Sequence, residues 1–349
     1  MKNIIIMSIF IFTTTGCAVL PDLMRTTVDI NATFSHDGEK LALISQRDCP
    51  ECIALYLADK DGTNERLLSR DIYWSIPPVF TLDNLNIIFL SKNKKDIVSI
   101  NVDTGITKII YSLSKITHYP IISADGSTIV LKRLMRQTGP TLIVIRTDDK
   151  RIIEINESKY PYDFISPNIS SDGSKIAFFH DKNLYVMGIK DLDVECMTRK
   201  YSSILEKDWP DVDLMMPSPM FSSDSRYIVF STQSKIYLTD IVSKELNSLV
   251  QCPHKLRVFA QMLSPNNKYI LFNAEGFQHY DWIEGLYLFN LEKGTTERLT
   301  HFSMFFTFSP DGKNILYHSG SERYNHGLYI MDIDGKNVRQ ISPDCKWCR

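Results

Sequence analysis

Glycine is sparse in this chain and widely spaced, which removes several catalytic motifs at once. The closest pair among the fifteen glycines is Gly320 and Gly327, seven residues apart. A nucleophile elbow (GxSxG), a dinucleotide fingerprint (GxGxxG) and a phosphate loop (GxxxxGK) all need closer glycines, because the backbone must turn tightly or approach a phosphate there. The zinc-hydrolase signature HExxH is missing too. We therefore expect none of these enzyme classes.

An excess of positive charge and long apolar runs are lacking as well. The 39 Lys and Arg residues against 41 Asp and Glu give a formal net charge of −2. This balance provides no basic field, so nucleic acid is not a predicted partner. After the first residues of the chain, no stretch is long and apolar enough to span a bilayer as a helix. The hydrophobic share of 44% still suffices for a large core.

What the chain does contain is one repeat, and its clearest copy is residues 305–342. There the chain alternates as a strand over 305–309, and Pro310-Asp311-Gly312 is turn chemistry. A second strand is expected over 314–319 and a third over 327–333, followed by the hairpin dipeptide Asp334-Gly335 and a fourth strand over 338–342. The unit reads as four consecutive antiparallel strands.

The same turn recurs seven times along the chain, 42 to 52 residues apart. Its acid or amide residues are Asp37, Asp83, Asp125, Asp172, Asp224, Asn266 and Asp311. The residue after each of them is Gly or Asn in six copies, which tolerates the left-handed conformation, while Ser225 does so poorly and marks the most degenerate turn.

A four-stranded unit repeated every 40 to 50 residues is typical of propeller blades. The sequence therefore predicts an all-β, seven-bladed β-propeller over 28–349, in which each blade has its own four strands and none is lent between the termini. A six-bladed ring is the alternative, with the second copy as the one that fails. No convincing helical period appears. The expected blades cover about 29–69, 76–111, 118–155, 165–198, 218–250, 258–300 and 305–342.

The N-terminus has the pattern of an export signal. A basic Lys2 precedes an apolar run over 4–12, and small residues lead to Cys17. Thr14-Thr15-Gly16-Cys17 resembles a bacterial lipobox, with Thr14 where Leu is commonest. We expect a signal peptide over 1–16, lipidation of Cys17 and a tether over 17–27, with ordinary cleavage and an uncleaved N-terminus as alternatives. The predicted location is a lipid anchor on the periplasmic side of a bacterial membrane or on the cell surface.

Two long insertions are expected on the face that also carries the connections between blades. They span 199–217 and 274–285. Aromatic residues with nearby charges suit a protein-binding surface. The alternative is that these side chains fold back over the end of the propeller, and exposure of the two tryptophans separates the two interpretations. The candidates are Trp209, His279, Tyr280 and Trp282.

Histidines from different blades could gather into a metal site without any linear motif. Solvated loop histidines are the commoner interpretation, and we expect no cofactor. The histidines at positions expected in the loops are His118, His279, His301, His318 and His326.

The cysteines form two CxxC pairs, Cys49/Cys52 and Cys345/Cys348. Blades one and seven are neighbours once a ring closes, so the two pairs are expected to approach each other. In an oxidising compartment, disulfide bonds within each pair or between the two pairs are the leading expectation. A Cys₄ zinc site or redox exchange by one pair remains open. Haem attachment is excluded, since Ile53 and Arg349 follow the pairs instead of His. Cys196 and Cys252 are expected to be unpaired.

The turn FSPDGK, the strand after it and the pattern LYxMDxDG resemble the TolB-like (WD40-like) propeller repeats over about 29–342. The resemblance implies a periplasmic propeller. TolB has six blades and an N-terminal α/β domain, whereas seven turns are present here and about ten residues separate Cys17 from the first strand. Similar propellers also accompany prolyl-oligopeptidase hydrolases, and no hydrolase domain is expected after the last strand.

These observations predict a non-catalytic envelope lipoprotein that binds a protein or glycan partner through its loops or channel mouth. The runner-up is a metal-dependent polysaccharide lyase, because oligogalacturonate lyases are similar propellers that hold a metal on histidines and glutamine. No lyase motif can be matched residue by residue. A permanent structural subunit of an envelope assembly differs from the first prediction only in how long the partner stays bound.

Overall fold

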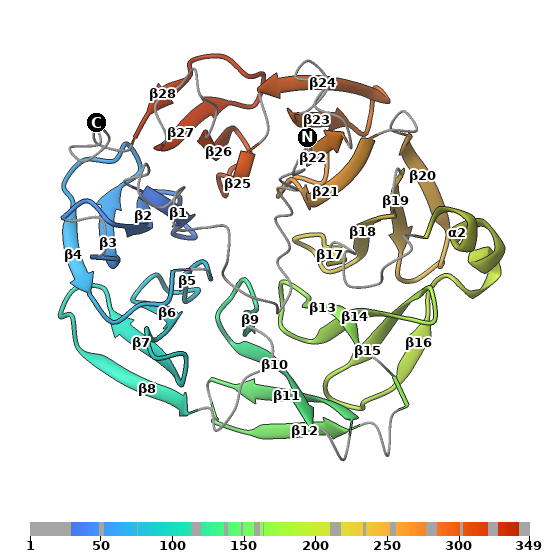
Figure 1. The fold of residues 1–349 in the computed structure, drawn as a ribbon, viewed down its shortest axis with the longest axis horizontal. Coiled ribbons are helices and arrows are strands. Elements are labelled where there is room, and N and C mark those ends of the chain that lie inside the picture. Colours follow the sequence, from blue (N-terminus) through green and yellow to red (C-terminus); the bar gives the residue numbers. More distant parts are fainter. Residues whose placement is uncertain are drawn as a thin grey trace, which may run out of the picture.

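The chain folds into a ring of seven four-stranded antiparallel sheets, in which each sheet takes four consecutive strands (Figure 1). This confirms the seven-bladed β-propeller and excludes the six-bladed alternative; the second blade is present. The structure is a computed structural model that describes residues 29–48, 52–74, 76–112, 120–135, 139–147, 149–156, 161–162, 164–209, 218–232, 235–251, 256–276, 285–300, 303–319 and 327–341.

The first four blades are built from the strands β1 (Asp29–Phe34), β2 (Lys40–Ser45), β3 (Ala54–Asp59) and β4 (Arg66–Ser69); β5 (Val79–Phe80), β6 (Asn86–Leu90), β7 (Asp96–Asn101) and β8 (Thr107–Ser112); β9 (Ile121–Ile122), β10 (Thr128–Met135), β11 (Gly139–Arg146) and β12 (Ile152–Asn156); and β13 (Ile165–Ile169), β14 (Lys175–His180), β15 (Asn183–Gly188) and β16 (Val194–Cys196).

The last three blades are built from β17 (Met220–Phe221), β18 (Tyr227–Ser231), β19 (Lys235–Asp240) and β20 (Leu246–Gln251); β21 (Leu256–Leu263), β22 (Tyr269–Gly276), β23 (Gly285–Asn290) and β24 (Thr295–Thr300); and β25 (Ser303–Phe308), β26 (Asn314–Ser319), β27 (Gly327–Asp332) and β28 (Arg339–Gln340). Two short helices, η1 (Arg199–Tyr201) and α2 (Ser202–Asp208), lie between blades four and five. No helix among the described residues is long and apolar enough to cross a membrane.

The second and third strands of each blade are apolar on both faces, because neighbouring blades cover both sides. In β2, Leu41 and Leu43 pack toward blade seven, whereas Ala42 and Ile44 pack toward blade two. Successive strand residues point to opposite faces of a sheet, so a strand buried on both faces is apolar at every position. This explains the near-continuous hydrophobic runs at the centre of each repeat.

Seven apolar clusters hold the ring together, one at each junction between neighbouring blades. The junction that closes the ring joins blade one to blade seven in the same way as the other six. There Phe34, Leu43 and Tyr56 pack with Leu328 and Ile330. Because every strand pairs within its own blade, the prediction that no strand is exchanged between the termini is confirmed. Side-chain packing holds this junction, as it holds the other six.

One polar turn is built seven times, between the first and second strands of every blade. A buried or half-buried hydroxyl donates to the turn acid or amide at 2.5–2.7 Å. The same hydroxyl accepts the backbone N–H five residues after it at 2.8–3.0 Å. The hydroxyl residues are Ser35, Thr81, Ser123, Ser170, Ser222, Ser264 and Ser309.

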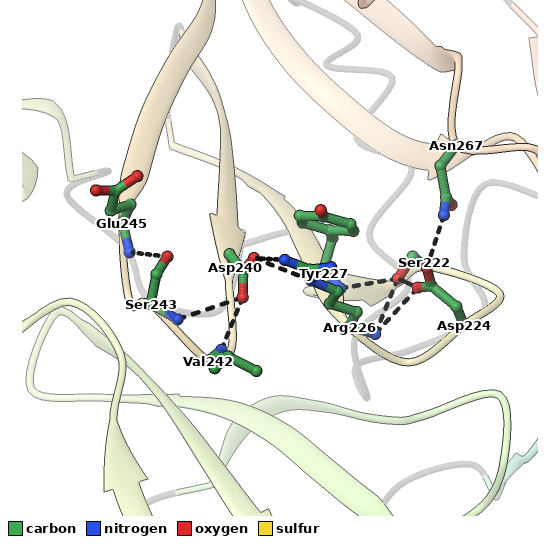
Figure 2. A network of polar contacts seen from close by, with 9 residues as sticks. All are labelled: Ser222, Asp224, Arg226, Tyr227, Asp240, Val242, Ser243, Glu245 and Asn267. Carbon is green, nitrogen blue, oxygen red and sulfur yellow. Dashed lines mark hydrogen bonds and ion pairs between the residues drawn. The ribbon is translucent and has the colours of Figure 1, made fainter.

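Figure 2 shows this turn in blade five. Ser222 donates to Asp224, and both accept backbone N–H groups of the residues that follow. Ser225 adopts a φ of 57°, so even the turn without Gly or Asn takes the left-handed conformation. In the equivalent turns of blades one, two and seven, the hydroxyl bond is the leading cause that lowers the pKa of Asp37, Asp83 and Asp311 below the usual range.

The turns also connect neighbouring blades. Asn267 of blade six donates to the Asp224 carboxylate at 3.0 Å (Figure 2), and the Ser223 hydroxyl donates to the Pro265 carbonyl at 2.7 Å. Between blades one and two, the His36 N–H donates to the Asn84 side chain at 2.7 Å. The polar atoms of these turns are thus largely used in building the ring.

We predict that Ser309→Ala lowers the free energy of unfolding by about 1–3 kcal/mol, because the Asp311 carboxylate and the Asn314 N–H lose a buried partner. Ser309→Thr is the matched control, since Thr81 fills this position in blade two. Denaturant unfolding checks both variants. An Ala variant as stable as the Thr variant would show that the hydroxyl does not contribute to the free energy of unfolding.

Candidate functional site: the loop face

The two ends of the strands form two different faces of the ring. At one end, a backbone bond joins the two hairpin turns of each blade, as from Ile333 to Lys313 at 2.8 Å; we call this end the turn face. At the opposite end lie the β2–β3-type loops and the connections between blades. There the Tyr73 N–H donates to the Leu90 carbonyl at 2.8 Å. We call this end the loop face.

The insertion after blade four is helical in part, where the sequence predicted only a loop. The η1 and α2 helices lie at the rim of the ring beside β20 (Figure 1). The Thr198 hydroxyl accepts the Leu184 N–H at 2.9 Å and donates to Asn183 at 3.1 Å, and Ser202 donates to the same Asn183 side chain at 2.8 Å. Leu205 is fully buried in the junction between blades four and five. The insertion is therefore fixed to the ring.

Trp209, a predicted binding-face residue, belongs to the core. Its side chain is 6% exposed and lies edge-on to Phe179, with ring centroids 5.3 Å apart. It packs with Leu205 and Phe230 at the same junction. The sequence left two interpretations of this insertion open. Trp209 fits the one in which the insertion folds back over the propeller. The other three candidates, His279, Tyr280 and Trp282, lie outside the described residues.

Next to this insertion, blade four presents a group of aromatic side chains that sequence reasoning missed. Tyr162, from the connection before β13, lies 5.1 Å from His180 and 5.3 Å from Tyr185 between ring centroids. Phe178 stacks on Tyr185 at 5.8 Å and 11°. Tyr162 and His180 are half-buried, so their outer edges face solvent. The aromatic run YPYDF in this connection was the available signal.

A cation and a free thiol border these rings. Cys196 is a free cysteine, as predicted; Cys252 lies outside the described residues. Burial and the neighbouring Cys196 raise the pKa of Tyr185, and a hydrogen bond to Cys196 raises the pKa of the exposed Arg199. We call Tyr162, His180, Tyr185 and Arg199 the blade-four cluster. Aromatic rings beside a guanidinium are the side chains that most often dominate binding surfaces.

A second polar group fixes the start of blade one. Arg47 forms ion pairs with the buried Asp29, at 2.8 Å, and with Glu65. Its guanidinium lies 4.5 Å from the Tyr56 ring centroid. Burial opposes the charge, but the two carboxylates raise the pKa of Arg47. The Asp29 side chain is fully buried and that of Arg47 is 10% exposed, so this ion pair supports the loop after β2.

That loop carries one of the predicted cysteine pairs. Cys52 is in a disulfide bond, and its partner lies outside the described residues. The positions of Cys49, Cys345 and Cys348 are also outside them, as is Cys17. The pairing within or between the two CxxC motifs, and lipidation of Cys17, therefore stay predictions.

Histidines show no shared site in the part of the chain that the structure describes. No group of three or more His, Cys, Asp or Glu side chains is placed there to hold a metal ion. His318 was expected in a loop, but it is a fully buried residue of β26. The alternation of that strand turns its ring into the sheet packing. His118, His301 and His326 lie outside the described residues.

No protein-family model and no curated protein matches the chain. Among the solved structures that are similar to it are the following three. An oligogalacturonate lyase in complex with manganese has a TM-score of 0.66 and 15% identity over 87% of this chain and 88% of that one. The β-propeller domain of the Trilobed protease from Pyrococcus furiosus, which has an open velcro topology, has 0.61 and 14% over 90% and 98%. TolB from Acinetobacter baumannii has 0.49 and 18% over 88% and 61%. At such identities the likeness to the first two shows the fold alone, a β-propeller.

The burial of Trp209 leads to a prediction. Trp209→Ala removes a large side chain from the junction of blades four and five, so we expect the free energy of unfolding to fall by about 3–5 kcal/mol. Trp209→Phe keeps a ring against Phe179 and is the control, with a smaller loss. Unfolding in denaturant measures both. An Ala variant with unchanged stability would place Trp209 outside the core.

Proposed function

We propose that this protein is a non-catalytic, exported lipoprotein that binds another envelope protein or a glycan through its loop face. The blade-four cluster carries this proposal. Two of its rings, Tyr162 and His180, are half-buried and the third, Tyr185, is buried. The three lie within 6 Å of each other between centroids, and an insertion anchored by Thr198 and Ser202 holds Arg199 beside them. A preorganised site loses little side-chain freedom on binding.

The opposite face supports the same choice. In the first turns of that face, the hydroxyl and one oxygen of each carboxylate are used within the turn. The lowered pKa values of its acids follow from these bonds, so they mark structural residues, although shifted pKa values can also mark a functional site. The blade-four cluster combines stacking surfaces with a cation, which suits an aromatic or acidic protein segment or the apolar face of a sugar.

The N-terminal pattern supplies the location. Strand β1 begins at Asp29 on the loop face, twelve residues after Cys17. An acylated Cys17 carrying two or three chains anchors stably, whereas one chain alone is marginal. A fully extended tether of this length spans about 40 Å. The propeller would therefore lie close to the membrane, with its loop face on the side of the anchor.

Two sets of variants test the proposal. Cys17→Ala should move the protein from the membrane to the soluble fraction, with Cys196→Ala as the cysteine control; a wild type that fractionates as soluble contradicts the anchor. In crosslinked envelopes and on glycan arrays, Tyr162→Ala with Arg199→Ala should weaken capture of the main ligand by about tenfold or more. Lys313→Ala on the turn face is the matched control.

Equal capture by the cluster variant and the control would contradict the loop-face assignment. The lyase alternative has its own readout. If the purified protein held tightly bound manganese and cleaved a polyuronate, the result would favour the lyase over the binding function.

A further inference from the structure

The seven repeats act as internal controls for one another on the turn face. In every blade, the first residue after the third strand donates its N–H to the carbonyl of one residue in the first turn, at 2.8–3.0 Å. This bond defines an equivalent position in all blades. In six blades the position is polar or charged, and in blade two it is leucine. The seven residues are Glu39, Leu85, Ser127, Ser174, Arg226, Lys268 and Lys313.

A second position differs in the same blade. In six blades a backbone bond closes the second hairpin turn, and the carbonyl that accepts it identifies the equivalent residue. Five of these residues are polar or charged, and the one in blade two is isoleucine. They are Thr63, Ile106, Arg151, Asp193, Glu245 and Lys336.

These two apolar residues are neighbours in space. The backbone N–H of Asn101 donates to the Ile106 carbonyl at 2.9 Å, and its side-chain amide donates to the Leu85 carbonyl at 3.1 Å. Leu85 is 50% exposed and Ile106 is 70% exposed. Leu82, in the same turn as Leu85, is 66% exposed. We call Leu82, Leu85 and Ile106 the blade-two patch.

The patch is held rigidly. Asn84 takes a φ of 57° in the turn, the Asp83 carboxylate accepts the Leu85 N–H at 2.9 Å, and the Leu82 N–H donates to the Asp125 carbonyl of blade three at 3.2 Å. A single exposed apolar residue is ordinary on a protein surface. Here three lie on two joined turns, and at two of the three positions, Leu85 and Ile106, the other repeats place polar residues. Such a group indicates an interaction surface.

The charged residues around the patch indicate which kind of partner would bind it. Within the two turns, residues 81–86 and 101–106, the charged side chains are Asp83 and Asp103, and both are exposed. On the side of blade one, the Arg66 guanidinium is engaged by the Val102 carbonyl. On strand β8, Lys108 is the nearest exposed cation in sequence. The acidic groups thus lie within the two turns that carry the apolar side chains, and the cations Arg66 and Lys108 lie outside these turns.

The geometry points to a second docking surface, on the face opposite the blade-four cluster: the blade-two patch binds a protein segment in which apolar side chains are flanked by Lys or Arg. The apolar side chains of the segment cover Leu85 and Ile106, while its cations pair with Asp83 and Asp103. Such a surface would let one propeller hold two partners at once, one on each face. It does not depend on the nature of the ligand at the loop face.

The test uses variants borrowed from the chain's own repeats, which the fold already accommodates. Leu85→Lys copies blades six and seven, and Ile106→Glu copies blade five, so the double variant leaves the net charge unchanged. Val242→Ser is the matched control. Val242 is 80% exposed in the second turn of blade five, where the equivalent neighbours are Arg226 and Glu245 (Figure 2).

Random twelve-residue peptides displayed on phage are selected against the full chain carrying Cys17→Ala, purified without detergent. We expect enriched peptides that combine aliphatic or aromatic residues with Lys or Arg. Their affinity should fall by about tenfold or more in the double variant and stay unchanged in Val242→Ser. Circular dichroism and thermal unfolding confirm that all variants remain folded.

Two results would overturn the inference. One is a selection whose peptides lack basic residues or bind the double variant as well as the wild type. The other is a wild-type dimer, seen by light scattering, that the double variant abolishes, because the surface would then belong to a second copy of this chain. The variant with Tyr162→Ala and Arg199→Ala, which weakens binding at the loop face, should bind the selected peptides as well as the wild type does. The two surfaces are therefore tested separately.

Discussion

Every blade of this propeller buries both of its faces against its two neighbours, and the rest of the structure depends on that constraint. It explains why the second and third strands are apolar at successive positions, as in Leu41 to Ile44. It also makes the ring cooperative, because a blade at an open end would expose one complete face. The junction between blades one and seven thus replaces a shared strand by side-chain packing, with Tyr56 and Leu328 at its centre.

The polar turns complement this packing at one end of the ring. Each hydroxyl of the Ser35 type is a buried or half-buried polar group that is satisfied twice, because it donates to the turn acid or amide and accepts a backbone N–H. Because the same bonds recur in all blades, a departure in one blade carries information. The helical insertion that holds Arg199 is one such departure on the loop face. The apolar residues Leu85 and Ile106 are another, on the turn face.

Local chemistry made the fold predictable from sequence. The turn residues Pro310 to Gly312 and the strand over 314–319 are found as expected, because turn propensity and alternation act over a few residues. The last strand was expected over 338–342 but is only Arg339–Gln340, since an outermost strand has one pairing neighbour. The recurring Ser or Thr two residues before each turn acid or amide is visible in the sequence, yet its role as donor and acceptor follows only from the geometry.

The site was less predictable, because it depends on contacts between distant segments. Tryptophan is a residue type that is common in binding surfaces, but the position of Trp209 against Phe179 follows from packing between two blades. The α2 helix has seven residues, too few to show a 3.6-residue period in the sequence. The blade-four cluster combines Tyr162, His180 and Arg199 from three separate segments, so no linear sequence motif predicts it. The chain order alone could not bring them together.

Hydrogen exchange of individual amides tests most directly whether the closing junction is as stable as the other six. The measurement compares β2 and β26, which flank the closing junction, with β14 and β18, which lie across the ring. Closure by packing predicts protection factors that agree within about tenfold, because all seven junctions open only with the whole propeller. If the amides of β2 and β26 exchange about a hundredfold faster or more, the junction opens on its own and the account is contradicted.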